Sequence, residues 1–243
     1  MKIVGVIPVR FKSTRFPGKA LVKLRNKPLL QWVYENAQNA SSLDRVIVAC
    51  DDQRIWEFAK LLTAEVMLTS PDCRSGTERV AEIAKKIKAE IFVNIQGDEP
   101  FLEAQTIDFL VKNFLSDKKA EIGTLATLIK KEEDLNNPNI VKVVFTRDGY
   151  ALYFSRFAIP YKRDTNIKAK YQWYKHLGIY VYRRKALLDF VNLPLGRLEK
   201  MEKLEQLRAL ENGMRVKVFI TKKDSIGIDT PEDLKRAEEW LEK

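Results

Sequence analysis

The sequence predicts an α/β protein with an open, mostly parallel sheet of mixed type that helices cover on both faces. Short apolar segments rich in β-branched residues alternate with amphipathic helical segments over the first two-thirds of the chain. This alternation is typical of a parallel sheet with helical crossovers. The apolar segments also lack a regular exchange of apolar and polar positions, which is typical of strands buried on both faces.

The first four strands are expected at residues 2–9, 45–50, 65–69 and 90–95. Three helices are expected between them. The first begins at Pro28 and the second follows Asp52. The third begins at Ser75, because Ser75 and Glu78 form a capping-box pattern ahead of an apolar stripe.

The pattern changes after residue 140. Residues 141–155 predict a hairpin that turns at Asp148 and Gly149. Further strands are expected at 176–183 and 215–221, with one long helix over 198–213 that ends at Gly213. A last helix is expected after Thr230, the predicted N-cap, with Pro231 as its first residue.

A chain of 243 residues with 45% apolar residues can bury a full core. We expect one domain over residues 1–243. The irregular stretch within 150–183 is expected to form a small arm or subdomain for substrate binding or dimerisation. No repeat, low-complexity tract or linker divides the chain.

Charge and cysteine content narrow the function classes. The net formal charge of +10 predicts an anionic partner, which could be a nucleic acid, a lipid surface or a phosphorylated small molecule. Two cysteines make no disulfide framework or metal-binding spacing, which favours a reducing compartment. No apolar stretch is long enough to span a bilayer, and the N-terminal apolar run reads as a strand. These features predict a cytoplasmic protein without membrane insertion.

A basic loop follows the first predicted strand, in the segment RFKSTRFPGK. In open α/β sheets, ligands bind beyond the carboxyl ends of the strands. The loop lacks the P-loop pattern because Lys19 is followed by Ala20, and it lacks G-x-G-x-x-G. Its arginines can grip phosphate oxygens in pairs, which favours a triphosphate site over a solvated basic loop. The cationic side chains are Arg10, Lys12, Arg15 and Lys19.

Two acidic segments are expected at the same edge. NIQGDEPF places Asp98 after the fourth strand, and GIDTPEDL places Asp229 before the last helix. Carboxylates beside a polyphosphate site commonly hold Mg²⁺. The alternatives are a turn aspartate that caps a helix and an ordinary helix start. Together with the basic loop, the two aspartates predict a magnesium–nucleotide site.

Two other features leave alternatives open. His176 is the only histidine, and a lone histidine is more often structural than catalytic. Seven aromatic residues lie between 153 and 174. They could stack on single-stranded nucleic acid, but core packing and a subunit interface explain them better.

These segments together resemble the 3-deoxy-manno-octulosonate (Kdo) cytidylyltransferase family. The resemblance runs in order through IPVRFKSTRFPGKAL, SGTERVAE, NIQGDEPF, ALYFSRFAIP, HLGIYVYR, LEQLRALENG and GIDTPEDL. It implies a fold of the nucleotide-diphospho-sugar transferase type, a homodimer, and transfer of CMP from CTP to Kdo with release of pyrophosphate. The product, CMP-Kdo, activates Kdo for lipopolysaccharide biosynthesis.

The resemblance also implies roles for individual residues. The triphosphate would be held by Arg10, Ser13, Arg15 and Lys19. The cytosine would be received by Ser75 and Gly76, with Arg74 beside them. The Mg²⁺ cofactor would be ligated by Asp98 and Asp229, which with Arg10 and Lys19 form the expected catalytic set. The Kdo pocket would be lined by Gln96, Arg156, His176, Tyr180, Glu205 and Gln206.

Three departures from the family pattern stand out. Ala20 replaces a proline, Val9 replaces an alanine, and Arg74 replaces an uncharged residue beside the expected base pocket. None of them removes a charge that the chemistry needs. Two other functions remain as alternatives: a cytidylyltransferase for another acidic sugar such as a sialic acid, and a nucleic-acid-binding protein.

Overall fold

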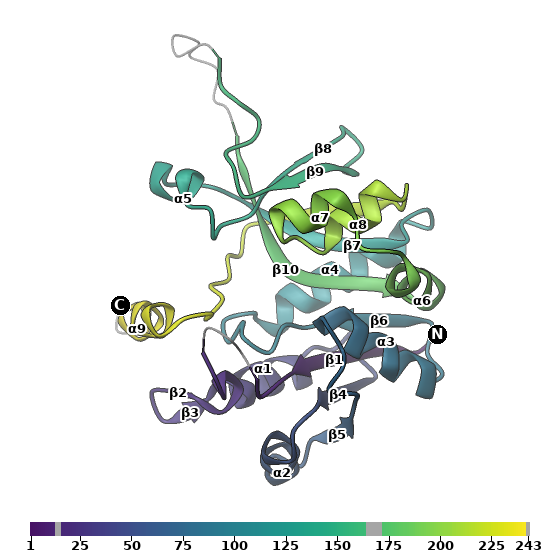
Figure 1. Cartoon of the computed structure of the whole chain (residues 1–243), viewed down its shortest axis with the longest axis vertical. Coiled ribbons are helices and arrows are strands. Elements are labelled where there is room, and N and C mark those ends of the chain that lie inside the picture. The colour runs from purple at the N-terminus through teal and green to yellow at the C-terminus, as the bar shows by residue number, and fades with distance from the viewer. Residues whose placement is uncertain (13–15, 164–171, 242–243) are drawn as a thin grey trace.

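The computed structural model describes residues 1–12, 16–163 and 172–241, and over these residues its centre is a mixed sheet of nine strands (Figure 1). The order is β11-β7-β10-β6-β1-β4-β5, with β8 beside β10 and β9 beside β8. The strands are β1 (Ile3–Val9), β4 (Arg45–Cys50), β5 (Glu65–Leu68), β6 (Ile91–Asn94), β7 (Ile122–Leu128), β8 (Lys142–Phe145), β9 (Ala151–Ser155), β10 (Tyr174–Arg183) and β11 (Val216–Thr221). The small strands β2 (Lys23–Leu24) and β3 (Lys27–Pro28) form a separate hairpin.

The main sheet is mostly parallel, as predicted. Strand β1 pairs in parallel with both β4 and β6, and β4 pairs in parallel with β5. Strand β10 is antiparallel to its neighbours β6 and β7, while β11 is again parallel to β7. The carboxyl ends of β1, β4 and β6 therefore meet at one edge of the sheet.

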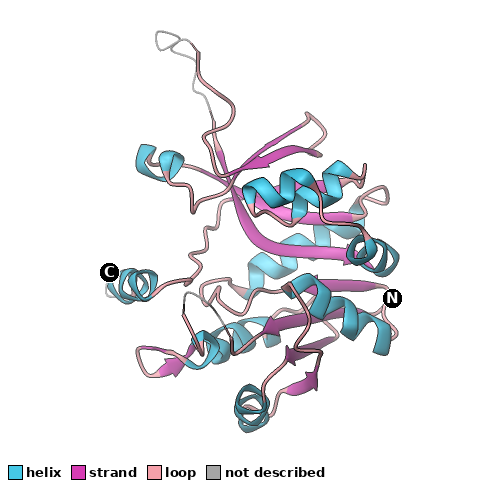
Figure 2. Cartoon of the chain, viewed as in Figure 1, coloured by secondary structure: helices cyan, strands magenta, loops and turns pink. Residues whose placement is uncertain are grey.

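Helices pack on both faces of this sheet (Figure 2). One face is covered by α1 (Leu29–Gln38), α2 (Gln53–Leu61) and α4 (Ala104–Ser116). The other is covered by α3 (Gly76–Lys86), α6 (Arg184–Asn192), α7 (Arg197–Glu202) and α8 (Gln206–Glu211). Alternate residues of β1 contribute to each side: Ile3 and Ile7 face the first set, and Val4 and Val6 face the second. The helix α5 (Glu132–Asn136) is short and has no buried residue, and α9 (Pro231–Trp240) packs beside β2.

The helix starts predicted after Asp52, at Ser75 and after Thr230 are confirmed. Asp52 caps α2, Ser75 caps α3 and Thr230 caps α9, and in each case the side chain accepts a hydrogen bond from a backbone N–H of the first turn. The capping box predicted at Ser75 is incomplete, because the Glu78 carboxylate accepts from the backbone N–H of Arg74 instead. The hairpin around Asp148 and Gly149 is also confirmed as β8 and β9.

The prediction of one long helix over 198–213 is wrong. The segment forms two short helices, α7 and α8, which are separated at Lys203, a residue with φ of 54°. The Arg208 guanidinium is buried against the Glu199 carboxylate, with Nη2–Oε1 at 2.6 Å and Nε–Oε2 at 2.8 Å. This contact folds α8 back onto α7, which one continuous helix would not allow.

The irregular stretch between β9 and β10 is described in part. Residues 156–163 and 172–173 contain no helix or strand, as expected. Residues 164–171, and with them Tyr171 of the aromatic group, lie outside the described residues. Phe154 is fully buried, whereas Phe157 and Tyr161 are 79% and 84% exposed. The described aromatic side chains therefore divide between core and surface.

Candidate active site

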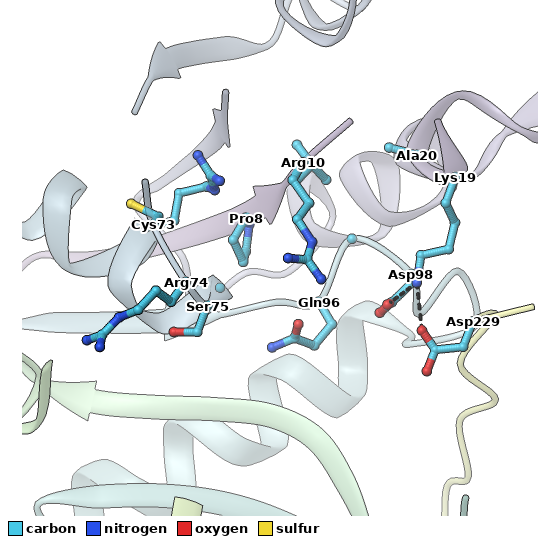
Figure 3. Close-up of a pocket in the computed structure, with 14 residues that line it drawn as sticks. Pro8, Arg10, Lys19, Ala20, Cys73, Arg74, Ser75, Gln96, Asp98 and Asp229 are labelled. Atoms are coloured by element: carbon cyan, nitrogen blue, oxygen red, sulfur yellow. Dashed lines mark hydrogen bonds and ion pairs between the residues drawn. The ribbon is translucent and has the colours of Figure 1, made fainter. Parts of the chain in front are cut away.

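A cleft of about 350 Å³ lies at the carboxyl ends of β1 and β6 (Figure 3). Its walls come from the end of β1, the basic loop, the start of α3, the turn after β6 and the tail before α9. The lining residues are Pro8, Val9, Arg10, Lys19, Ala20, Cys73, Arg74, Ser75, Gly76, Arg79, Gln96, Gly97, Asp98 and Asp229. The structure therefore brings four motifs that are far apart in the sequence into one cavity.

The turn after β6 lies against the end of β1 because residue 97 is a glycine. A Cβ atom at Gly97 would lie 2.4 Å from Val9 Cγ1 and 3.3 Å from the carbonyl oxygen of Pro8. Any other residue would push the turn away from the strand. The missing side chain thus places Asp98 directly beside the basic loop.

Lys19 lies between the two predicted metal ligands (Figure 3). Its Nζ donates to Asp98 Oδ2 at 2.6 Å and to Asp229 Oδ1 at 2.8 Å. The two acidic segments are also joined by their backbones, since the N–H of Ile228 donates to the carbonyl of Asp98 at 2.8 Å. The Asp233 carboxylate accepts from the N–H of Asp229 at 3.1 Å and holds the second acid at the start of α9.

The charge state of Lys19 follows from its surroundings. Burial of the side chain favours the neutral amine, but attraction to Asp98 and Asp229 and hydrogen bonds to both outweigh it. The pKa of Lys19 is therefore raised above its ordinary value of 10.5. The group remains a cation throughout the physiological range.

The pair of carboxylates fits Mg²⁺. Both acids converge on one cationic centre, and carboxylate oxygens are ligands that Mg²⁺ prefers. No group of three or more histidine, cysteine or acidic side chains that could hold a metal occurs within residues 1–12, 16–163 and 172–241. An Mg²⁺ ion held by two carboxylates ordinarily completes its shell with substrate phosphates and water.

The other residues predicted for the nucleotide differ in their positions. Arg10 lines the cleft and is exposed, so its guanidinium is accessible to an anion. Arg74 also lines the cleft, but its guanidinium is paired with Glu78 one turn along α3, with Nε–Oε1 at 2.8 Å. Ser13 and Arg15 lie outside the described residues.

The start of α3 forms the wall opposite Lys19. Ser75 Oγ accepts from the N–H of Glu78 at 3.2 Å, and Gly76 lies against the ring of Pro8. Both residues line the cleft. The Glu205 carboxylate meets this same turn, since its two oxygens accept from Ser75 Oγ and Thr77 Oγ1 at 2.6 Å each. Glu205 therefore binds α3 and does not line the cavity.

The residues predicted to bind the sugar do not all line the cleft. Gln96 lines the cleft, whereas Arg156, His176, Tyr180, Glu205 and Gln206 do not. The Arg156 guanidinium donates to the carbonyls of Glu202 and Pro138 at 2.7 and 2.9 Å. Tyr180 and Gln206 are buried.

His176 is buried on β10, in keeping with a structural role. Its Nε2 lies 3.0 Å from Thr124 Oγ1, and its ring packs against Phe154 and Tyr180. Burial lowers the pKa of His176 from 6.5 to about 3. The imidazole is therefore neutral at physiological pH.

Sequence reasoning missed two charged residues that shape the cleft. Arg79 is 2% exposed, and its Nη2 lies 2.9 Å from Asp51 Oδ2 in an ion pair. Asp51 also accepts from the backbone N–H of Phe11 in the basic loop at 3.2 Å. The capping pattern in this segment indicated roles for Ser75 and Glu78 but none for Arg79. The only signal for Asp51 was its position directly after a buried strand.

A cationic loop and two carboxylates at the carboxyl edge of an open α/β sheet define a protein of the sugar nucleotidyltransferase class. The family model described as cytidylyltransferase matches residues 4–218. The chain belongs to this family and, within it, to the 3-deoxy-manno-octulosonate cytidylyltransferases, as the following relatives show.

Curated relatives match the chain over nearly its whole length. The 3-deoxy-manno-octulosonate cytidylyltransferase of Thermodesulfovibrio yellowstonii is 49% identical, covering 99% of this chain and 98% of the relative. That of Solibacter usitatus is 50% identical, covering 97% and 92%.

Solved structures agree with this assignment. The structure of CMP:2-keto-3-deoxy-manno-octonic acid synthetase complexed with CTP is 36% identical, with a TM-score of 0.93 over 100% of this chain and 99% of its own. The 4-diphosphocytidyl-2C-methyl-D-erythritol synthase of Anaerococcus prevotii, at 15% identity and a TM-score of 0.65, covers 100% and 97% and shares the fold.

Proposed function

We propose that this protein transfers CMP from CTP to Kdo, giving CMP-Kdo and pyrophosphate, and so activates Kdo for lipopolysaccharide biosynthesis. The observation that carries the proposal is the convergence of Lys19, Asp98 and Asp229 in a cleft lined by the basic loop. The likeness to the CMP-Kdo synthetase complexed with CTP supports both substrates.

The reaction joins two anions, so charge compensation is its main demand. The anomeric hydroxyl of Kdo attacks the α-phosphorus of CTP, a new O–P bond forms, and pyrophosphate leaves with the electrons of the broken P–O bond. The hydroxyl proton passes to solvent or to a phosphate oxygen. Arg10 and Lys19 orient the triphosphate and offset the charge that builds on the leaving group. Positioning and electrostatics, rather than covalent catalysis by a side chain, account for the rate.

The Mg²⁺ ion would be held by Asp98 and Asp229. When bound, it neutralises charge on the phosphate oxygens and helps to hold the reacting groups in line. In the structure, the Lys19 ammonium compensates the two carboxylates. Its flexible four-carbon stem allows it to turn from the acids to a phosphate when the nucleotide enters.

The base and the sugar would occupy neighbouring parts of the cleft. Ser75, Gly76 and Arg74 lie at the start of α3 and would receive the cytosine. Gln96 would meet the sugar from the turn after β6. Arg156, His176, Tyr180, Glu205 and Gln206 are proposed to support the sugar side, with Glu205 acting through its bonds to Ser75 and Thr77.

We further infer a cytoplasmic homodimer. Both cysteines are free thiols, which supports a reducing compartment. In the part of the chain that the structure describes, no helix is both long and apolar enough to cross a bilayer. The exposed apolar side chains of Leu152, Phe157 and Tyr161 support a subunit contact around the stretch between β9 and β10.

Pyrophosphate release tests the proposed function. The purified protein is assayed with each of CTP, UTP, ATP and GTP against Kdo and against a sialic acid, with and without Mg²⁺. We expect release with CTP and Kdo together in the presence of Mg²⁺, and none when either substrate is omitted.

Three results would count against the proposal. Preference for the sialic acid would replace the substrate, and preference for another nucleotide would replace the donor. Full activity after removal of divalent cations by EDTA would remove the metal from the mechanism.

A further inference from the structure

A chain of hydrogen-bonded side chains runs from α8 through the interior of the sheet to the cleft. Thr77 Oγ1 donates to Glu205 Oε2 at 2.6 Å, and Asn94 Nδ2 donates to Thr77 Oγ1 at 3.3 Å. Gln96 Nε2 then donates to Asn94 Oδ1 at 3.2 Å. Thr77 and Asn94 are 2% and 1% exposed, so water does not replace these contacts.

The charge state of Glu205, where this series of hydrogen bonds begins, fixes which group donates in each of them. Burial raises the pKa of Glu205, while hydrogen bonds from Ser75 and Thr77 and the Arg208 guanidinium, 3.7 Å from Oε1, favour its ionised form. When Glu205 is ionised it only accepts hydrogen bonds, so Thr77 uses its single proton toward Glu205. Its remaining lone pairs then accept from the Asn94 amide nitrogen. This leaves the Asn94 carbonyl oxygen as the partner for Gln96, which must present its NH₂ group inward.

The result is a defined polarity at the cleft. With its NH₂ group bound to Asn94, Gln96 offers its carbonyl Oε1 elsewhere. A Cβ atom at Gly76 would lie 3.7 Å from this Oε1, and one at Gly178 would lie 3.5 Å from Gln96 Cγ. The side chain therefore lies between the two glycines, and Figure 3 shows it between Ser75 and Asp98.

We infer that Thr77 and Asn94 are positioning residues that orient the Gln96 amide, so that its carbonyl accepts a hydrogen bond from a hydroxyl of the acid-sugar substrate. The inference rests on the proposed function and names no new reaction. It assigns two buried residues a role in substrate recognition. A flipped amide would present N–H groups and lose this acceptor.

The energy at stake is that of one directed hydrogen bond. A neutral hydrogen bond contributes about 0.5–1.5 kcal/mol, which corresponds to a change of about 2- to 12-fold in affinity. We call the hydrogen-bonded chain from Glu205 through Thr77 and Asn94 to Gln96 the relay. Its loss should therefore raise the Michaelis constant for Kdo by about 3- to 10-fold. The Michaelis constant for CTP should change by less than about twofold, because Ser75 keeps its bond to Glu205.

The experiment is steady-state pyrophosphate release with Thr77→Val, which keeps the shape of the side chain and removes the hydroxyl. Thr77→Ser restores a hydroxyl and should restore the Michaelis constant for Kdo. Thr106→Val is the matched control, since Thr106 is buried on α4 and shares no hydrogen bond with the relay. Melting temperatures of all variants report whether each is folded.

A double-mutant cycle separates positioning from general destabilisation. If Thr77 acts through Gln96, Thr77→Val should add nothing to the Michaelis constant for Kdo in a Gln96→Ala background. Should Thr77→Val fail to fold, Asn94→Leu breaks the relay at its next bond and keeps the contact between Thr77 and Glu205. The same selective rise is then expected.

The contrary results are distinct. An equal rise of both Michaelis constants, an additive effect in the Gln96→Ala background, or a Thr77→Val enzyme indistinguishable from Thr106→Val overturns the inference alone. A wild-type enzyme that releases no pyrophosphate with Kdo refutes the proposed function and the inference with it.

Discussion

Lys19 meets two carboxylates that lie 79 and 210 residues away in the chain. Nothing local dictates this meeting, and each residue reaches it from a different element. The basic loop follows β1, Asp98 follows β6 and Asp229 precedes α9. At the scale of single residues, the site therefore forms only because the order of the strands brings these three side chains together.

The two aspartates are expected to be essential for turnover. Asp98→Asn and Asp229→Asn remove a charge where we propose that a metal and a triphosphate are held. Each should lower kcat by roughly 10²–10³-fold, the usual effect of losing a preorganised charged partner. Pyrophosphate release checks this, with circular dichroism to show that the fold persists. Near-normal turnover in both variants would refute the metal assignment.

His176 should make the protein less stable in mild acid. Its folded pKa is depressed to about 3, while in the unfolded chain it is near 6.5. The unfolded state therefore binds a proton between these values and the folded state does not, so stability falls as the pH drops below about 6.5. Between pH 7 and pH 5 this group alone should remove about 2 kcal/mol from the free energy of unfolding.

Urea unfolding at the two pH values measures this effect. His176→Gln has no titrating ring and should lose about 2 kcal/mol less than the wild type over the same interval. Identical pH dependence in both proteins would show that the imidazole titrates with the same pKa in the folded and unfolded states.

Residue types alone predicted some of the charged side chains that the cleft brings together, but missed its buried charged and polar members. Arg10, Lys19, Asp98 and Asp229 stand in short motifs whose chemistry is readable without a fold. Thr77 and Asn94 carry no such signal, because a threonine in a helix and an asparagine at the end of a strand are ordinary. Their roles depend on partners that only packing brings near.

At the scale of elements, capping residues were the most reliable signals. Ser75, Asp52 and Thr230 each start the helix that they predicted, since a side-chain oxygen at the N-cap satisfies a free backbone N–H wherever the helix lies. The helices α4 and α6 and the strand β7 were not predicted. The strand β7 contains Thr124 and Thr127, which are buried in the structure. Because threonine is polar, the segment does not stand out in the sequence as an apolar run.

The break between α7 and α8 shows where local reasoning failed. The residues of 198–213 favour a helix throughout, but the buried contact between Arg208 and Glu199 requires a turn at Lys203. Tertiary packing outweighed helix propensity, which amounts to less than about 1 kcal/mol per residue.

Loss of this contact should be costly. Arg208→Leu leaves the buried Glu199 carboxylate without its ion-pair partner, so the free energy of unfolding should fall by about 3–5 kcal/mol. Arg197→Leu is the control, because Arg197 lies exposed on the same pair of helices. Denaturant titration measures both, and a loss below about 1 kcal/mol for Arg208→Leu would mean that the pair does not hold the two helices together.

At the scale of the whole molecule, the exposed apolar side chains around the stretch between β9 and β10 point to a second subunit. Leu152 is 61% exposed, and Phe157 and Tyr161 are more exposed still. A group of large apolar side chains on the surface is typical of an interaction site.

Sedimentation should therefore show a homodimer at micromolar concentration. Phe157→Asp, which places a charge among these side chains, should shift the equilibrium toward monomer. Leu61→Asp is the matched control, since Leu61 is also exposed but lies on α2. A wild-type protein that sediments as a clean monomer would contradict the expected dimer.

The sequence by itself determined the class of fold, the positions of several helix starts, and the cationic and acidic side chains that line the cleft. These features are local, because they depend on periodicity, on caps and on the chemistry of single side chains. Only the tertiary structure decided that Lys19 lies between Asp98 and Asp229, that Glu205 binds α3, and that the segment 198–213 bends. Each of these depends on contacts between residues far apart in the chain, and their energies arise only when the sheet has brought them together.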